Sequence, residues 1–307
     1  MEAETLRPIA LAGARLSRYG VLSVAGEDAR PFLHAQLTSD VEHLTSQRAA
    51  LAGWCSAKGR LLASFLVVAR ADGFLLQLAR DLAPAVAKRL SMFVLRSRVK
   101  LHDASDAWVQ LGLWGEDAAR GVAAAGFDVP AAPFAVAARG DSLVVNYGTG
   151  RFLVLAPSGE AEALERAIGA PRAGEEAWAL MEIRAGHPLI TAATQDRFVP
   201  QMVNLEALGG VDFHKGCYPG QEIVARTQYR GQLKRRMVRA RLPAGAAARA
   251  GQDLFGDEPP GQASGTVVDV APAPGGGEML AVVPIGSTVR LAPGGQPLDH
   301  LPLPYGA

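Results

Sequence analysis

Residues 198–236 read FVPQMVNLEALGGVDFHKGCYPGQEIVARTQYRGQLKRR, and the centre of this stretch carries the most specific chemistry of the chain. The tetrapeptide YPGQ at 218–221 has the composition of a tight turn. Proline suits the second position of a type II turn, and glycine suits the third position, where φ is positive. We expect a short helix to begin near residue 221 and to stop before Gly231. The stretch therefore predicts a turn that leads directly into a helix.

Cys217 stands immediately before this turn, and Lys215 lies two residues further back. A helix N-terminus and a neighbouring cation both favour a thiolate over a thiol, so Cys217 is a candidate reactive cysteine or transient metal ligand. A buried and inert thiol is an equally good interpretation of the spacing alone. The only other cysteine is Cys55, so the 307 residues hold neither a secreted disulfide framework nor a four-cysteine metal site within one chain.

A run of basic residues follows the turn: Arg226, Arg230, Lys234, Arg235, Arg236, Arg239 and Arg241. Such a run can bind a polyanion, namely a polyglutamate tail, a phosphate or RNA. The alternative is a solvated face of a helix that continues into a strand. Tyr229 is the one aromatic residue inside the run, which argues against sequence-specific stacking on single-stranded RNA.

Residues 174–188, GEEAWALMEIRAGHP, predict the clearest helix of the chain. Two glutamates occupy its first turn, where the helix dipole favours negative charge, and Gly186 followed by Pro188 suits its end. Trp178 and Met181 fall on one face of this helix. From the periodicity alone, Trp178 is more simply a core residue than a ligand contact.

The rest of the chain indicates an α+β protein with antiparallel sheets rather than a doubly wound parallel sheet. We expect a helix over 28–38 with Asp28 as its N-cap. Strands 50–57 and 61–69 are expected to pair through the turn Lys58-Gly59-Arg60. From about residue 236, short β-like runs alternate with Gly/Pro turns, which is typical of a small β-barrel or sandwich.

We therefore divide the chain into an α+β region of two intertwined subdomains at 1–235 and a C-terminal β-barrel at 236–307. The composition, with 49% hydrophobic and 20% charged residues, is that of a soluble globular protein. A net charge of +1 argues against a surface built entirely for nucleic acid, but it is compatible with a local basic patch. The N-terminus does not have the pattern of a secretory signal, and no run of 18 apolar residues occurs, so we expect a cytoplasmic protein without membrane contact.

The signature string is Lys215-Gly216-Cys217-Tyr218-Pro219-Gly220-Gln221-Glu222, and it resembles the K-G-C-Y-x-G-Q-E motif of YgfZ-type folate-binding proteins, relatives of the glycine-cleavage T-protein. The resemblance continues through Arg226, Arg230, Gly231 and Lys234 downstream, and through Pro200, Gln201, Asn204 and Leu205 upstream. Weaker matches cover the N-terminal half, including the Lys58-Gly59-Arg60 turn, so the resemblance spans nearly the whole chain.

This resemblance implies a three-part, ring-like T-protein architecture around a cavity that accepts tetrahydrofolate or a derivative. It implies two aromatic residues at that cavity, which map onto Tyr19 and Trp178, and it moves our interpretation of Trp178 towards a ligand contact. Glu182 is a further candidate for pterin recognition. Arg226 and Arg230 are candidates for the anionic part of the folate, and we expect the Cys217 turn to open onto the same cavity.

Two departures separate this chain from T-proteins. Their acidic pair, which assists chemistry at the folate, is replaced by Ala63 and Ser64, and a serine hydroxyl cannot replace a carboxylate in acid–base work near neutral pH. Their pterin-binding glutamate is replaced by Arg184. These losses weigh against an aminomethyltransferase, although the residues leave open whether the protein catalyses a reaction.

The resemblance thus implies a folate-binding factor that supports the maturation or repair of iron–sulfur proteins and, through them, tRNA modification. Its functional pair would be Cys217 and Lys215, and its partners would be the iron–sulfur assembly machinery or cluster-containing client enzymes. A folate-dependent aminomethyltransferase or other one-carbon transferase is the alternative. A module that contacts tRNA directly through the basic run is a third hypothesis.

Overall fold

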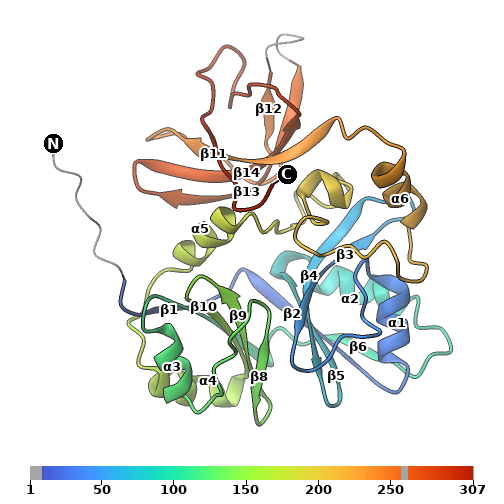
Figure 1. Cartoon of the computed structure of the whole chain (residues 1–307), viewed down its shortest axis with the longest axis vertical. Helices are drawn as coiled ribbons and strands as arrows, with labels where there is room; N and C mark the ends of the chain where they lie inside the picture. The colour runs from blue at the N-terminus through green and yellow to red at the C-terminus, as the bar shows by residue number, and fades with distance from the viewer. Residues whose placement is uncertain (1–8, 257–261, 307) are drawn as a thin grey trace.

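The computed structural model describes residues 9–256 and 262–306. Its strands form three five-stranded sheets, and the pairings within each sheet are antiparallel. Figure 1 shows the three sheets arranged around the centre of the molecule, two below and one above. The predicted α+β class with antiparallel sheets in a ring-like arrangement is therefore confirmed. None of the helices in the described ranges is long and apolar enough to cross a membrane.

The first sheet has the strand order β3-β4-β5-β2-β6. Its strands and helices are β2 (Tyr19–Ala25), α1 (Ala29–Gln36), β3 (Ala49–Cys55), β4 (Leu61–Arg70), β5 (Gly73–Ala79), η1 (Arg80–Leu82), α2 (Ala83–Ser91) and β6 (Lys100–Asp103). The expected hairpin through residues 58–60 is present as β3 and β4. Asp28 precedes α1 as expected, but its carboxylate accepts a hydrogen bond from the Arg98 backbone N–H at 2.7 Å instead of capping the helix. The expected side-chain cap is therefore wrong, because the Asp28 carboxylate instead holds the segment just before β6.

The second sheet has the order β1-β7-β10-β9-β8. Its elements are β1 (Ala12–Arg15), β7 (Trp108–Trp114), α3 (Ala118–Ala124), β8 (Val136–Arg139), β9 (Ser142–Gly148), β10 (Arg151–Pro157) and α4 (Ser158–Ile168). Because strand side chains alternate, β10 contributes to two cores. Phe152 and Val154 join the cluster beneath α3 and α4, while Leu153 and Leu155 join the main central cluster.

The third sheet has the order β12-β13-β14-β11-β15. Its strands are β11 (Arg235–Leu242), β12 (Asp253–Phe255), β13 (Ala263–Ala273), β14 (Gly276–Pro284) and β15 (His300–Leu301). For this region a barrel was expected, and the described residues form an antiparallel sheet with two short edge strands. An isolated bridge from Phe255 to Arg290 and a hydrogen bond from Leu298 N–H to the Val289 carbonyl connect the two edges.

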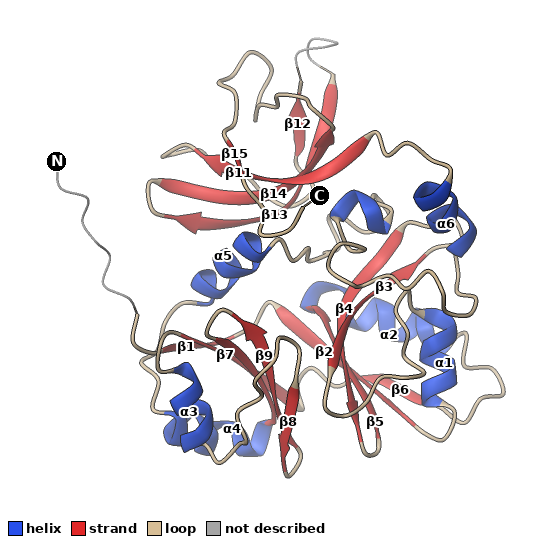
Figure 2. Ribbon diagram, in the orientation of Figure 1, coloured by secondary structure: helices blue, strands red, loops and turns tan. Residues whose placement is uncertain are grey.

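Helix α5 (Glu175–Ala185) lies between the sheets and packs against β13 and β14 (Figure 2). It ends at Gly186, whose φ of +71° is left-handed. A Cβ at that position would also approach the Tyr305 hydroxyl to 2.3 Å, so glycine is required there. Trp178 is only 1% exposed, and its ring rests against Gly112, where a Cβ would approach it to 2.5 Å. The helix is thus fixed at both ends, which holds Glu182 in one place.

Candidate functional site

A small cavity with polar and apolar lining lies beneath α5, where the first and second sheets meet it. We call it the α5 chamber, and its polar lining consists of Tyr19, Ser64, Gln77, Tyr147, Glu182 and His187. Its volume is about 40 Å³. That is slightly more than the share of one water molecule in the liquid, roughly 30 Å³. Tyr19 and Glu182, two of the residues predicted to bind folate, therefore share one small hollow.

Glu182 is a buried carboxylate with two cationic or polar neighbours. Its Oε1 accepts a hydrogen bond from Arg151 Nη1 at 2.6 Å, and its Oε2 lies 3.3 Å from His187 Nδ1. Burial alone would raise the pKa of Glu182, but His187 and Arg151 together bring that pKa below its usual value. The chamber therefore holds an ionised carboxylate at neutral pH.

Mainly aliphatic side chains line the rest of the chamber, and its aromatic side chains are Tyr19, Phe65 and Tyr147. The Tyr147 hydroxyl donates to Gln77 Oε1 at 3.1 Å, and burial raises the pKa of both Tyr19 and Tyr147, so both phenols stay neutral. Trp178 lies behind Tyr147, with the two ring centroids 5.3 Å apart. The guanidinium carbon of Arg151 lies 5.5 Å from the Trp178 centroid. Trp178 is thus in contact with the residues of the chamber.

The donor set of the chamber suits a pterin, because a carboxylate, an amide and two phenols can pair with ring N–H and carbonyl groups between aromatic faces. Its volume is smaller than such a ligand needs, since small-molecule sites begin at roughly 300 Å³. A pterin would therefore enter only if the lining side chains move apart.

The two departures from T-proteins also have definite places. The Ser64 hydroxyl donates to the Pro188 carbonyl at 3.1 Å and accepts from the Ile190 N–H at 3.0 Å, so it ties the segment after α5 to β4. Ala63 is fully buried. Arg184 turns to the third sheet and pairs with Glu278 at 2.8 Å. These positions hold the sheets together.

The signature motif forms the predicted turn and helix. The N–H of Gln221 donates to the Tyr218 carbonyl at 3.2 Å, and Gly220 has a φ of +78°. Helix α6 (Gln221–Tyr229) begins directly after this turn and ends before Gly231. A Cβ on Gly220 would approach the Ser56 carbonyl to 2.4 Å, so glycine allows the turn to contact the tip of the β3–β4 hairpin.

Lys215 and Cys217 are both in this turn region. The Lys215 ammonium donates to the carbonyl of Leu37 at 2.7 Å and to that of His34, and it lies 5.0 Å from the Tyr218 ring centroid. Burial lowers the pKa of Lys215 to about 8. Cys217 is an exposed free thiol, whereas burial raises the pKa of Cys55 to about 12.

The chamber and the turn are two separate places. The chamber contacts the middle of β4 at Ser64, whereas the turn contacts the hairpin tip at Gly59. None of the residues 215–222 lines the chamber. The expectation that Cys217 opens onto the chamber is therefore not met. Arg226 and Arg230 are exposed on α6 and also lie apart from the chamber.

Three polar residues of the chamber, Gln77, Tyr147 and His187, were missed in the sequence, and so was Arg151, the partner of Glu182. Arg151 offered a usable signal, because it opens the apolar run RFLVLA at 151–156 and a charged residue in a buried strand needs a buried partner. His187 follows the C-cap glycine of α5, and nothing in its local pattern separates it from an ordinary loop residue.

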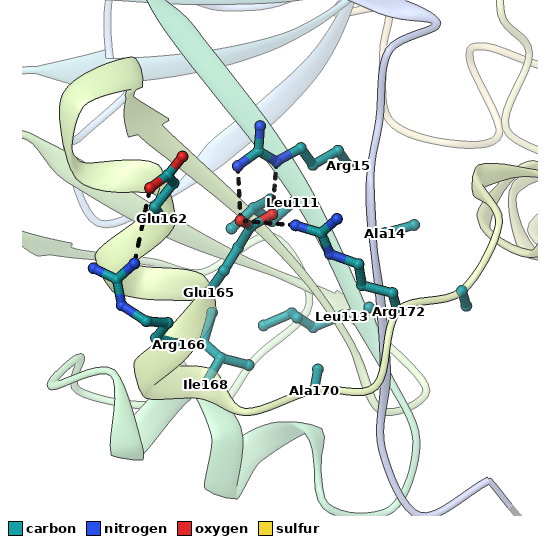
Figure 3. Close-up of a pocket in the computed structure, with 12 residues that line it drawn as sticks. Ala14, Arg15, Leu111, Leu113, Glu162, Glu165, Arg166, Ile168, Ala170 and Arg172 are labelled. Atoms are coloured by element: carbon teal, nitrogen blue, oxygen red, sulfur yellow. Dashed lines mark hydrogen bonds and ion pairs between the residues drawn. The ribbon is translucent and has the colours of Figure 1, made fainter.

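A second hollow, of about 570 Å³, lies on the outer side of the second sheet between β1, β7 and α4. Figure 3 shows its charged side chains pointing towards one another. Arg15 pairs with Glu165 at 2.7 Å, Arg172 approaches the same carboxylate to 3.9 Å, and Arg166 lies 3.8 Å from Glu162. The predicted site residues lie elsewhere.

Comparison with known proteins gives relatives over most of the chain. The tRNA-modifying protein YgfZ of Edwardsiella ictaluri (strain 93-146) is 34% identical over 305 residues, which cover 95% of this chain and 91% of the relative. The protein of the same name from Yersinia pestis (strain Pestoides F) is 31% identical over 243 residues, covering 78% and 73%. No family model matches the chain.

Among solved structures, the glycine cleavage system aminomethyltransferase T of Bartonella henselae superposes with a TM-score of 0.74. The match covers 95% of this chain and 84% of that structure at 19% sequence identity, so it is a likeness of fold. Sequence and fold together confirm the resemblance inferred from the signature motif. This chain belongs to the family of the tRNA-modifying protein YgfZ.

Proposed function

We propose that this protein binds tetrahydrofolate or a derivative in the α5 chamber. In this proposal it supports the maturation or repair of iron–sulfur proteins in the cytoplasm and, through them, tRNA modification. The observation that carries the folate part is the ionised Glu182, held by Arg151 and His187 on the wall of an aromatic and polar hollow. The tRNA part is supported by the relatives, which are named as tRNA-modifying proteins.

Each chamber residue has a definite task in this proposal. Tyr19 and Tyr147 would face the pterin ring, while Glu182 would accept hydrogen bonds from its N–H groups. Arg151 and His187 are positioning residues, because they fix and ionise Glu182. The bound folate would supply one-carbon or redox chemistry. Trp178, directly behind Tyr147, would report its arrival.

Cys217 and Lys215 form the second functional place. An exposed thiol beside a lysine is suited to nucleophilic or metal-ligand chemistry. Among the residues the structure describes, no group of three or more His, Cys, Asp and Glu side chains is placed to hold a metal ion. We therefore propose that any iron–sulfur cluster handled at Cys217 is cargo, with its other ligands supplied by a client or assembly protein.

A one-carbon transferase is the second candidate, because the fold is that of an aminomethyltransferase. The hydroxyl of Ser64 is occupied by two backbone hydrogen bonds, and Ala63 has no polar atom in its side chain. Neither residue supplies the acid or base that such a transfer needs. Robust turnover of a lipoylated carrier protein in a glycine-cleavage assay would favour this second candidate.

The folate proposal is tested by titrating the protein with tetrahydrofolate while tryptophan fluorescence is recorded. We expect a saturable change that Trp178→Phe abolishes. Glu182→Gln keeps the side-chain volume but removes the charge, and it should weaken binding at least about tenfold, or 1.4 kcal/mol. Glu165→Gln, in the hollow of Figure 3, is the matched control and should bind normally. Unchanged binding by Glu182→Gln would place the folate elsewhere.

A further inference from the structure

The surface around α6 gathers residues from segments that lie far apart in the sequence. The β3–β4 turn at 58–60 packs against the first turn of α6, since a Cβ on Gly59 would lie 2.8 Å from the Ile223 Cβ. Figure 1 shows the tip of this hairpin reaching α6, with β11 beginning just beyond the helix. Arg60, α6 and the start of β11 therefore belong to one continuous surface.

A hollow of about 380 Å³ in this surface is lined by three arginines and one aspartate: Arg60, Arg197, Arg235 and Asp196. Arg60 donates to the Arg197 carbonyl at 2.6 Å, and Arg197 donates to the Gly251 carbonyl at 2.7 Å. These two guanidinium groups are thus held in place. Arg197 is also paired with Asp253 at 3.2 Å, so Arg60 and Arg235 face the single carboxylate of Asp196 and give the hollow a small excess of positive charge, which suits a phosphate group.

Further cations extend this hollow along the surface. In the ranges 9–256 and 262–306, the side chains of Arg230, Lys234 and Arg235 make no ion pair or hydrogen bond. All three are exposed. Arg226, the one arginine within α6, is neutralised by Glu222 at 3.0 Å. Several unpaired cations on one surface suit a polyanion better than a single small anion.

An exposed aromatic ring lies next to these cations in the chain. Tyr229, at the end of α6, is 65% exposed. Phe213 meets its ring edge-on, with centroids 6.0 Å apart and planes at 71°. The contact fixes the orientation of a tyrosine that is otherwise in solvent. A base can stack on such a ring whatever its identity, provided that the base is unpaired.

We infer that this surface, the α6 face (Arg60, Arg197, Tyr229, Arg230, Lys234 and Arg235), binds an unpaired segment of tRNA. A backbone phosphate would occupy the arginine hollow, and a base would stack on Tyr229. A polyglutamate tail has charges but no ring, so it leaves the exposed Tyr229 unexplained. The inference rests on the tRNA part of the proposed function and is independent of the folate part.

The α6 face also lies next to the exposed thiol of Cys217. Cys217 precedes α6 by four residues, and Tyr229 ends the helix. A helix of nine residues is about 13 Å long. RNA on this surface would therefore lie beside Cys217. The thiol could then act near bound tRNA, and no separate tRNA-binding site would be needed.

The test measures the binding of unmodified tRNA by fluorescence anisotropy over a series of salt concentrations. Wild type should bind at low salt, and log Kd should rise linearly with log salt concentration. Arg230→Ala/Arg235→Ala should lower that slope by about 1.4, which corresponds to two phosphate contacts at about 0.7 each. Tyr229→Ala should weaken binding about tenfold with the slope unchanged, and Tyr229→Phe should bind like wild type.

Arg120→Ala/Arg166→Ala is the matched control, because it removes two exposed arginines from α3 and α4 and changes the net charge equally. It should bind tRNA normally. Absence of tRNA binding at low salt, competition by polyglutamate at equal charge, or equal loss in the control would overturn the inference. The tetrahydrofolate titration, run on the same variants, separates the two proposals: an intact folate response in a protein without tRNA binding rejects the α6 face alone.

Discussion

An Arg–Glu ion pair lies at the α5 chamber and another on helix α6, in opposite surroundings. Arg151 and Glu182 meet at 2.6 Å, with side chains 6% and 9% exposed. Arg226 and Glu222 meet at 3.0 Å, with side chains 64% and 83% exposed. In the chamber the charges satisfy one another away from water, whereas on α6 water and salt screen them.

This contrast distinguishes two kinds of ligand-binding site. The chamber is small and its polar groups are already hydrogen-bonded, so a ligand must displace side chains and replace existing hydrogen bonds there. The α6 face is open: Arg230, Lys234 and Arg235 can meet a ligand without first breaking protein contacts, whereas Arg60 and Arg197 already donate to backbone carbonyls. Substitution of a chamber residue should therefore mainly lower the free energy of unfolding, and substitution of a residue of the α6 face should mainly weaken ligand binding.

The largest expected effect is that of Arg151→Met. The variant leaves the Glu182 carboxylate buried without its closest partner, which costs about 3–5 kcal/mol of the free energy of unfolding. Urea denaturation at pH 7 measures this loss. The double variant Arg151→Met/Glu182→Met should recover most of the loss, because both charges are then removed. A loss no larger than that of the exposed control Arg166→Met would contradict the buried pair.

The same variant should respond to pH in a defined direction. In the wild type the pKa of Glu182 is below its unfolded value, so its stabilising contribution is present above about pH 4.3 and disappears as the pH falls through the folded pKa. Without Arg151 the carboxyl group can take up a proton more easily. The difference in stability between wild type and Arg151→Met should therefore shrink as the pH falls below about 4.3.

A smaller effect, about tenfold, is expected for Lys215→Met on the alkylation rate of Cys217 at pH 7. The Lys215 ammonium interacts electrostatically with Cys217 and would stabilise the negative charge on the attacking sulfur, and the pKa of Lys215 is about 8. The wild-type advantage should fade as the pH rises through 8, where the ammonium loses its proton. Mass spectrometry after iodoacetamide treatment measures both rates.

Cys55 is the internal reference for this reaction, because burial raises its pKa to about 12. Native protein should therefore carry the label on Cys217 alone, and unfolded protein should carry it on both cysteines. Labelling of native Cys55 at a comparable rate would show that β3 opens, and equal rates for wild type and Lys215→Met would remove Lys215 from the chemistry of the thiol.

Much of the local structure was predictable because its causes are local. Gly186 and Gly220 adopt left-handed φ values at the positions where a helix end and a type II turn require them. The order of the strands was not predictable in the same way. β1 pairs with β7 across almost a hundred residues, and only tertiary packing selects that partner.

The residues of the candidate site also differ in how far the sequence predicts them. Tyr19 and Glu182 were found through the family resemblance, and the fold brings them to one hollow. The partner of Glu182 was not found, because Arg151 reaches it from another sheet. The joining of the Lys58-Gly59-Arg60 turn to α6 is likewise a tertiary contact, made possible by two glycines that leave room for it. The small volume of the chamber depends on side-chain packing, which no pattern of residue types specifies.

The smallest expected effect completes the comparison. Arg226→Met breaks an exposed pair between residues four apart on one helix, so we expect a loss of about 0.3–0.5 kcal/mol in the free energy of unfolding at low salt. At about 0.5 M salt the Debye length is well below 10 Å, so the exposed pair is screened. The difference between Arg226→Met and wild type in the free energy of unfolding should then vanish. Arg151→Met should keep its full effect at both salt concentrations, because its pair is shielded from ions. If the two variants showed the same salt dependence, the chamber would be open to solvent and its ion pair would be no more protected than the one on α6.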